Sequence, residues 1–255
     1  MILLSNLIQK QGTFMNQFSP LDHDLIYHTL ADEILQFEHK PGDILSENML
    51  CQRFSMSRTP ARSILQRLQE NGLVQIVPHK GSMVTKLNYD IVHQSIYQRV
   101  AVESMVFRDF VRTCSPIDVE KARYAMQRLE EIGDVFFKRP EEFEVNQFLR
   151  TDLQMHEIWF RSTKKRYLWE RLSGSIQASY TRFCTLDIIE GSNVRDVLDE
   201  HREMLKMIDE KRIDDIEELF HKHLYGGIRR LGGLMFTKYA DYFEPPEEED
   251  DYAET

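Results

Sequence analysis

The chain has 255 residues, of which 42% are hydrophobic and 29% charged, and its formal net charge at pH 7 is −10. This length can hold one large domain or two modest ones, and the composition is that of an ordinary soluble globular protein. No apolar run approaches the roughly 20 residues needed to span a bilayer, so the sequence predicts no membrane partner.

The cysteines and the first residues bear on the compartment. Three cysteines, odd in number and far apart, do not suit a disulfide framework. The N-terminal apolar block is too short for a secretory signal and lacks a small-residue cleavage site. The sequence therefore predicts a reducing, cytoplasmic location.

The charges are distributed unevenly along the chain. Residues 244–255 hold seven acidic residues and no basic one, and without them the net charge is −3. Residues 57–86 carry five basic residues against one acidic residue, a local charge of +4. A locally basic module on an acidic protein keeps nucleic acid open as a partner.

The first domain is predicted to span 21–87. Residues 1–20 show no sustained periodicity and are expected to be a loose extension. A helix over 26–37 has apolar residues at helical spacing and ends before the turn signal Lys40-Pro41-Gly42. Ser46 is placed to cap a second, short helix.

A third helix and a hairpin complete this domain. Ser57 is placed to cap the helix, whose apolar residues recur at i, i+3, i+4 and i+7 from Ala61 until Asn71-Gly72 ends it. Short strands over 73–78 and 82–86 follow, around a flexible tip. The order helix, helix, turn, helix, hairpin predicts a winged helix-turn-helix.

The helix over 57–70 has a polar face that suits the DNA major groove. Arginine at its exposed N-terminal half can reach guanine or phosphate, and hydroxyls there can bond phosphate oxygens. The predicted contacts with double-stranded DNA are Ser57, Arg58, Thr59, Arg62, Gln66, Lys80 and Gly81. The alternative is an ordinary solvated face, but the complete order of elements favours DNA binding.

Residues 88–240 are predicted to form a second, all-helical domain. The amphipathic pattern is interrupted near Ser115-Pro116, Arg139-Pro140 and Gly191-Ser192, and the connections have lengths typical of a helical bundle. The acidic residues 241–255 are expected to be a disordered tail. The predicted fold is thus mainly α, with a small β-hairpin wing and a C-terminal helical bundle.

Three predicted helices, 145–160, 194–208 and 213–231, carry polar residues on their apolar stripes. These residues are Asp152, His156, His201 and His223. An ionised aspartate buried without a partner costs several kcal/mol. A divalent metal held by all four residues would remove this cost.

Simpler interpretations exist for each residue alone. A histidine on an apolar face is more often a satisfied core residue, and Asp152 and His156 at i, i+4 could be a hydrogen-bonded pair. Four such residues on inward faces favour a metal site, whereas His221 is expected to be exposed. The donor set predicts Zn²⁺ first, with Mn²⁺ or Ni²⁺ as alternatives.

The first domain resembles the DNA-binding domain of GntR-type bacterial transcription regulators. The matching stretches are Leu45-Ser46-Glu47, Met56-Ser57-Arg58-Thr59-Pro60-Ala61-Arg62, Gly72-Leu73, and Gly81 with Val84. Many members have arginine after the acidic residue, where this chain has Asn48, so a DNA contact from that position does not carry over.

The second domain resembles the FCD ligand-binding domain of the FadR-like branch. The matches are Asp152 with His156, Glu200-His201 through Leu205, and His223-Leu224. The resemblance implies that the metal helps to hold a small organic acid effector. It also implies that Arg99, in an R-x-x-x-E match, could pair with the effector carboxylate, although an ion pair with Glu103 is an equal alternative. Arg182 is a weaker effector candidate.

The leading hypothesis is a homodimeric, ligand-responsive transcription regulator that binds a palindromic operator and is not an enzyme. One alternative is a metalloenzyme, but the H-E-x-x-H pattern that begins at His156 fails at Phe160. Another is a regulator that senses the metal alone. Whether Arg99 faces the metal cavity or solvent separates this last alternative from the leading hypothesis.

Overall fold

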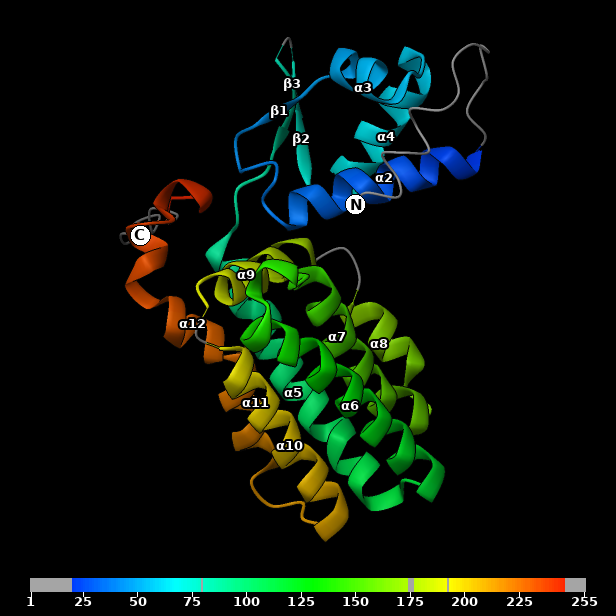
Figure 1. The fold of residues 1–255 in the computed structure, drawn as a ribbon, viewed down its shortest axis with the longest axis vertical. Coiled ribbons are helices and arrows are strands. Elements are labelled where there is room, and N and C mark those ends of the chain that lie inside the picture. Colours follow the sequence, from blue (N-terminus) through cyan, green and yellow to red (C-terminus); the bar gives the residue numbers. More distant parts are fainter. Residues whose placement is uncertain (1–19, 79, 174–176, 192, 246–255) are drawn as a thin grey trace, which may run out of the picture.

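The computed structural model describes residues 20–78, 80–173, 177–191 and 193–245 (Figure 1). A small domain of helices and a three-stranded sheet lies at one end, and a larger bundle of helices forms the rest. The predicted class, mainly helical with a small wing, is confirmed. None of the helices in these ranges is long and apolar enough to cross a membrane. Residues 1–19 of the expected extension and 246–255 of the expected tail lie outside the described residues.

The small domain has the order of elements that the sequence predicts. Its elements are α2 (Pro20–Leu35), β1 (Ile44–Leu45), α3 (Glu47–Phe54), α4 (Arg58–Glu70), β2 (Val74–Val77) and β3 (Gly81–Val84). The strands pair antiparallel in the order β1-β3-β2, so β1 adds a third strand to the predicted hairpin. Apolar faces of the helices and sheet share one core, which includes Ile26, Leu30, Ile34, Leu50, Ile64, Leu65, Leu68 and Val84.

The helices α3 and α4 begin differently. The Ser46 hydroxyl accepts a hydrogen bond from the Met49 N–H at 3.1 Å, as predicted for a cap. Ser57 occupies the cap position of α4 in an extended conformation, but its side chain makes no capping hydrogen bond. The predicted place of the cap is therefore right, whereas the hydroxyl of Ser57 remains exposed at the N-terminus of α4.

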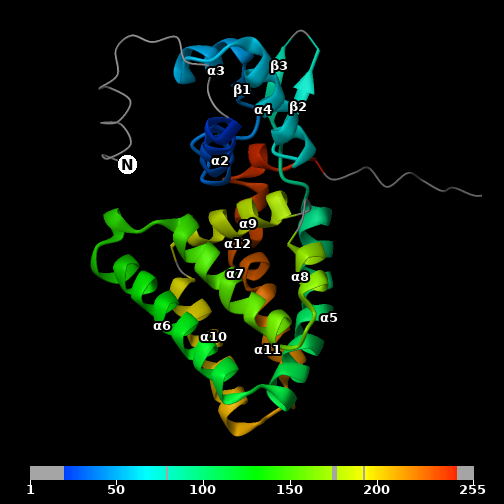
Figure 2. The ribbon, with the colours of Figure 1, turned by 90° about the vertical axis from the view of Figure 1, so that its right-hand side faces the viewer.

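The large domain is a bundle in which α7 lies in the middle (Figure 2) and contacts α5, α6, α8 and α9. Its helices are α5 (Tyr89–Thr113), α6 (Pro116–Lys138), η1 (Pro140–Glu142), α7 (Val145–Ser162), α8 (Arg166–Leu172), α9 (Gln177–Ile189), α10 (Val194–Glu210), α11 (Ile216–Leu224), α12 (Gly226–Leu231), η2 (Gly232–Phe236) and η3 (Ala240–Tyr242). The α6 helix starts with a capping box between Ser115 and Asp118, at the first predicted break.

The helix expected over 213–231 is divided into α11 and α12. Its first turn is absent because Asp215 has a left-handed φ of 64°, and the break falls at Tyr225. Gly226 and Gly227 follow and are buried. A Cβ on Gly227 would lie 2.8 Å from Phe183 Cε1 and 3.1 Å from Asp187 Oδ2, so glycine is needed for the close approach to α9.

The helix expected over 26–37 ends two residues early, at Leu35. Phe37 has a φ of 60°, and its ring packs on Tyr242, 5.2 Å between centroids. The sequence pattern suggested a place for Phe37 on the helix, but its partner lies at the far end of the chain.

The two domains meet at α9 and at the linker that follows β3 (Figures 1 and 2). Ala178 of α9 packs against the core of the small domain. The C-terminal segment returns beside the linker, where the Leu87 N–H donates to the Tyr242 carbonyl at 2.8 Å and the Glu244 N–H donates to the Leu87 carbonyl at 2.9 Å. The linker is therefore held by α9 and by the C-terminal segment.

Candidate metal centre and nucleic-acid interface

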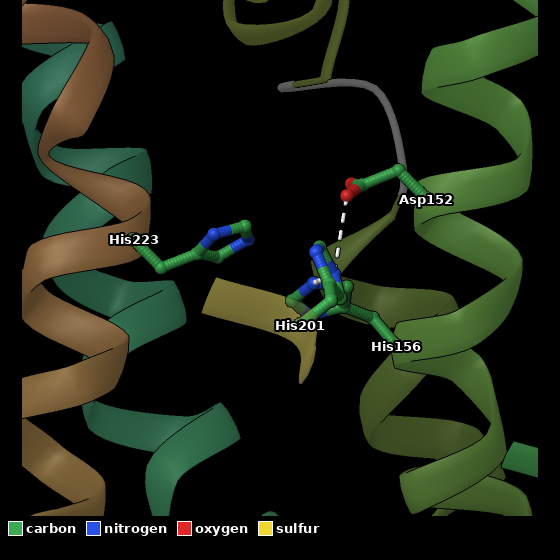
Figure 3. A group of neighbouring side chains, drawn as sticks. All are labelled: Asp152, His156, His201 and His223. Carbon is green, nitrogen blue, oxygen red and sulfur yellow. Dashed lines mark hydrogen bonds and ion pairs between the residues drawn. The ribbon is translucent and has the colours of Figure 1, made fainter. Parts of the chain in front are cut away.

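The four polar residues singled out in the sequence converge inside the bundle (Figure 3). Asp152 and His156 come from α7, His201 from α10 and His223 from α11. One ligand atom from each lies within 4.8 Å of every other. Helices that are distant in sequence thus bring three imidazoles and one carboxylate to one point.

The cluster is largely closed off from solvent, although the Asp152 side chain is 14% exposed. His156 and His201 are fully buried, and His223 is 8% exposed. Asp152 Oδ1 lies 3.3 Å from His201 Nε2, and none of the described residues gives it a conventional hydrogen bond. A buried carboxylate oxygen in this state points to a cation at the centre of the cluster.

Each imidazole is oriented by an acceptor on its outer nitrogen. His156 Nδ1 bonds to the Glu103 carboxylate, His201 Nδ1 lies 2.8 Å from the Val197 carbonyl, and His223 Nδ1 lies 2.9 Å from Glu200 Oε2. These acceptors place the N–H on Nδ1 and leave Nε2 with a lone pair. Carboxylates or carbonyls behind ligand histidines are typical of metal sites.

Two of these lone pairs face each other. His156 Nε2 and His201 Nε2 are 3.2 Å apart. Two nitrogens bound to one ion at about 2.1 Å lie roughly 3–3.4 Å apart, so the observed separation fits a shared metal. Burial lowers the pKa of His201 to about 3, and the ring is therefore neutral and able to act as a ligand.

The acids around the cluster are ionised. Burial alone would raise the pKa of Asp152, but interactions with the neighbouring imidazoles and with Arg99 lower it overall. Burial likewise opposes ionisation of Glu103, but Arg99 and His156 bring its pKa down to about 2. The site therefore presents one carboxylate and three imidazole nitrogens, a set that suits Zn²⁺ and also Mn²⁺ or Ni²⁺.

Sequence reasoning missed the orienting acids Glu103 and Glu200 as part of the site. Both are buried, at 0% and 3% exposed. Glu103 was expected only as an ion-pair partner of Arg99, and Glu200 only as the residue before His201. Their positions on the buried faces of α5 and α10 are the signal that could have identified them, because buried acids need partners.

Arg99 faces the interior of the bundle and is 6% exposed. Its Nε donates to Glu103 Oε1 and its Nη1 to the Tyr180 hydroxyl, both at 2.5 Å. Its Nη2 is buried and meets no acceptor among the described residues. The ion pair with Glu103 is thus present, and one donor group of Arg99 is still available to a ligand.

Arg182 lies elsewhere. Its side chain is fully buried, and its guanidinium donates to Thr85 and Lys86 of the interdomain linker. The structure does not bring it together with the four candidate ligands.

The space beside the cluster is small. A cavity of about 50 Å³ is lined by Asp152, His223, Tyr180, Asn193 and Arg230, among other residues. A second cavity of about 20 Å³ lies against Arg99 and also touches Tyr180. These volumes hold at most a few water molecules, and the Tyr180 ring lines both cavities.

The predicted DNA-contacting residues lie on one domain and most of them are exposed. Ser57, Arg58, Thr59, Arg62, Gln66 and Lys80 are exposed, and Gly81 is half-buried. Gly81 has a φ of +105°, and a Cβ there would lie 3.2 Å from Ile44 Cγ2, so the wing needs glycine at this position.

Two of the three arginines of α4 contact α3. Arg62 Nε donates to Glu47 Oε1 at 2.8 Å, and Arg58 Nη2 donates to Asn48 Oδ1 at 3.3 Å. The side chain of Arg62 is nevertheless 65% exposed. Asn48, at the position where many members of the resembled family have arginine, therefore lies beside Arg58.

Comparisons with known proteins were made for both domains. The model described as "Bacterial regulatory proteins, gntR family" matches residues 23–84, and the FCD domain model matches residues 95–226. The HTH-type transcriptional repressor RspR of Escherichia coli (strain K12) is 26% identical over 212 residues, which cover 83% of this chain and 89% of that protein.

Solved structures share the fold at low sequence identity. Escherichia coli McbR/YncC is 15% identical with a TM-score of 0.63, and the alignment covers 85% of this chain and 98% of that one. A GntR regulator from Rhodococcus sp. RHA1 is 19% identical with a TM-score of 0.59, covering 83% and 98%.

Proposed function

This chain belongs to the GntR family of bacterial regulatory proteins and carries an FCD domain, and on this basis we propose that it is a cytoplasmic transcription regulator whose DNA affinity responds to ligands in the helical domain. The response to ligands is inferred from one observation, the cluster of Asp152, His156, His201 and His223 inside the bundle. In this cluster each imidazole is oriented by a hydrogen-bond acceptor on its Nδ1. A ligand changes DNA affinity only if it binds the two arrangements of the protein unequally.

DNA is contacted by α4 and the wing. The exposed residues Arg58 and Arg62 reach bases or phosphates, and the unused hydroxyl of Ser57 bonds a phosphate at the N-terminus of the helix. Lys80 and the backbone at Gly81 approach the neighbouring groove. Arg62 exchanges Glu47 for DNA on binding, and such exchange costs little because exposed ion pairs contribute little.

Two copies of the chain bind a palindromic operator. A two-fold DNA site matches the symmetry of a homodimer and sets the spacing of its two recognition helices.

The four clustered residues hold a divalent ion, with Zn²⁺ as the first candidate and Mn²⁺ or Ni²⁺ as alternatives. When bound, the ion would supply a Lewis-acidic centre, and an ion of higher coordination than four would accept a carboxylate beside the four protein ligands. The chain supports this with a neutral His201, an ionised Asp152, and the acids Glu103 and Glu200 that fix the orientation of His156 and His223.

The effector is a small organic acid whose carboxylate is bound by the buried Nη2 of Arg99. A guanidinium that keeps one donor available after pairing with Glu103 suits this role. A regulator that senses the metal alone is the second candidate, and the small volume of the cavities, about 50 and 20 Å³, favours it.

The test has two parts. Elemental analysis of the purified full chain is expected to find one bound divalent ion, and the double variant His201→Ala/His223→Ala is expected to lose it. Full metal occupancy in that variant would mean that the site lies elsewhere. Selection from a random duplex library is expected to return a palindrome, and a thermal-shift screen of small carboxylates with metal-loaded protein separates the two candidates.

A further inference from the structure

The helix α9 contacts both the metal cluster and the DNA-binding domain. Tyr180 lines a cavity together with Asp152 and His223, and Arg182 contacts the interdomain linker. The two residues are two positions apart on a helix, so their side chains leave it on nearly opposite sides. One rigid element thus joins the proposed ligand site to the linker.

On the cluster side, polar contacts run without a gap from a candidate ligand to α9. The Glu103 carboxylate bonds His156 with one oxygen and accepts from Arg99 Nε with the other. Arg99 Nη1 donates to the Tyr180 hydroxyl. All four residues are buried, at 9% exposed or less, so no solvent screens these contacts.

On the linker side, Arg182 is bound to a residue that also bonds the end of the recognition helix. Its Nη1 donates to the Thr85 carbonyl at 2.6 Å, and its Nη2 to the Thr85 hydroxyl at 3.0 Å. That hydroxyl donates to the Gly72 carbonyl at 2.7 Å, and the Thr85 N–H donates to the Leu73 carbonyl at 3.1 Å. Gly72 and Leu73 follow Asn71, the residue that caps the C-terminus of α4.

The Arg182 guanidinium is an expensive group to bury. It is fully buried, its bonds are to neutral acceptors, and burial lowers its pKa to about 10. A charge buried among neutral acceptors destabilises the fold compared with an apolar residue of similar size. We therefore expect Arg182 to have a role beyond packing, namely to hold the linker through its bonds to Thr85.

We propose that α9 transmits the occupancy of the metal cluster to the recognition helix, through Tyr180–Arg99 at one end and Arg182–Thr85–Gly72 at the other, which rests on the metal site proposed above. Metal binding fixes His156 and thereby Glu103, Arg99 and Tyr180. The ordered α9 then holds Thr85 and the end of α4 in one arrangement. Tyr180 and Arg182 act as positioning residues that touch neither metal nor DNA.

The second attachment of the linker provides a matched control. Glu244 accepts a hydrogen bond from Asn88 Nδ2 at 2.6 Å and belongs to the C-terminal segment. No described contact joins Glu244 to the metal cluster. The charge of Glu244 also acts on Arg182, so the control is Asn88→Ser, which removes the bond to Glu244, keeps a capping hydroxyl for α5 and leaves the path through α9 intact.

The experiment is hydrogen–deuterium exchange with mass spectrometry on the full chain, metal-stripped and loaded with Zn²⁺. In the unmodified protein, Zn²⁺ is expected to slow exchange around 145–160 and 194–224, and also in 72–87 by roughly 5-fold or more. Tyr180→Phe, Arg182→Gln and Thr85→Val are expected to lose the response in 72–87 and keep it around the cluster. Asn88→Ser is expected to keep both responses.

The outcomes distinguish a failure of the proposed transmission through α9 from a failure of the proposed metal site. Protection around 145–160 and 194–224 with none in 72–87 of the unmodified protein contradicts transmission through α9. An undiminished response of 72–87 in Tyr180→Phe and Thr85→Val contradicts it as well. Absence of any Zn²⁺ response around the cluster instead contradicts the proposed metal site. Tyr180→Phe lies far from 72–87 in sequence and keeps its ring, so it remains informative if Arg182→Gln fails to fold.

Discussion

The polar groups of α4 and those of the helical bundle have opposite relations to solvent. Arg58 and Arg62 are exposed and make contacts with α3 that water can replace at little cost. His156 and Glu103 are fully buried, and each is bonded to a specific partner. Residues on the surface can therefore exchange partners when DNA arrives, whereas the buried ones hold a fixed geometry and lose much if a partner is removed.

The largest effect is expected for Glu103→Gln, which takes the negative charge from a buried cluster. Arg99 would keep its charge without a counter-ion, so the free energy of unfolding should fall by about 3–5 kcal/mol. Urea unfolding of the metal-stripped protein measures this. Zn²⁺ affinity, measured by competition with a chelator, should fall roughly 10–100-fold because His156 loses its orienting acceptor. An unchanged stability would show that the pair with Arg99 is not buried in solution.

The second effect is a dependence of stability on pH in the metal-stripped protein. Burial, opposed by Asp152, lowers the pKa of His201 to about 3 from a usual 6.5. Between these values the unfolded chain binds more protons at this residue, so stability falls as pH drops below about 6.5, by at most about 1.4 kcal/mol per pH unit. Urea unfolding from pH 7 to 4.5 measures the slope, which His201→Gln should reduce. A slope that is the same in the variant would assign the titration to another group.

The third effect concerns the exposed arginines. Arg58→Ala and Arg62→Ala are expected to weaken binding of a selected operator duplex by roughly 1–3 kcal/mol each if they contact bases. Fluorescence anisotropy at a fixed salt concentration measures this. Arg67→Ala is a suitable comparison, because Arg67 is engaged by Asp24 and lies 3.9 Å over the Tyr27 ring. Normal operator binding by both Arg58→Ala and Arg62→Ala would contradict the assignment of α4 to the DNA interface.

The smallest effect is expected for Glu47→Gln, the exposed counterpart of Glu103→Gln. Glu47 pairs with Arg62 at the surface, so its loss should change the free energy of unfolding by no more than about 0.5 kcal/mol. The same urea titration measures it. A cost close to that of Glu103→Gln would erase the distinction between the two regions.

The four candidate ligands could be picked out from the sequence because the buried face of a helix repeats every three or four residues, and a polar residue within that repeat stands out. Asp152, His156, His201 and His223 interrupt apolar stripes, and their helices bring them within 4.8 Å of one another. The resemblance to two families, drawn from short motifs, is confirmed by the family models. In these cases the necessary information is local to one helix or one motif.

The features that the sequence did not indicate depend on the three-dimensional arrangement of the chain, chiefly on contacts between distant segments. The buried contact of Arg182 with Thr85 joins residues 97 positions apart, and no periodicity within α9 indicates it. The helix expected over 213–231 is divided next to the close approach of Gly227 to α9, which its own sequence does not reveal. The unused hydroxyl of Ser57 likewise depends on backbone geometry rather than on residue type.

The return of the C-terminal segment to the linker affects the order in which the protein is assembled during synthesis. The N–H and carbonyl of Leu87 are hydrogen-bonded to the backbones of residues 242 and 244, and the Asn88 side chain donates to Glu244, 156 positions away. Contacts this distant in sequence form late, because a long loop must close first. The small domain has its own core and can fold as it leaves the ribosome, whereas its attachment to the bundle is completed only once residue 244 has been added.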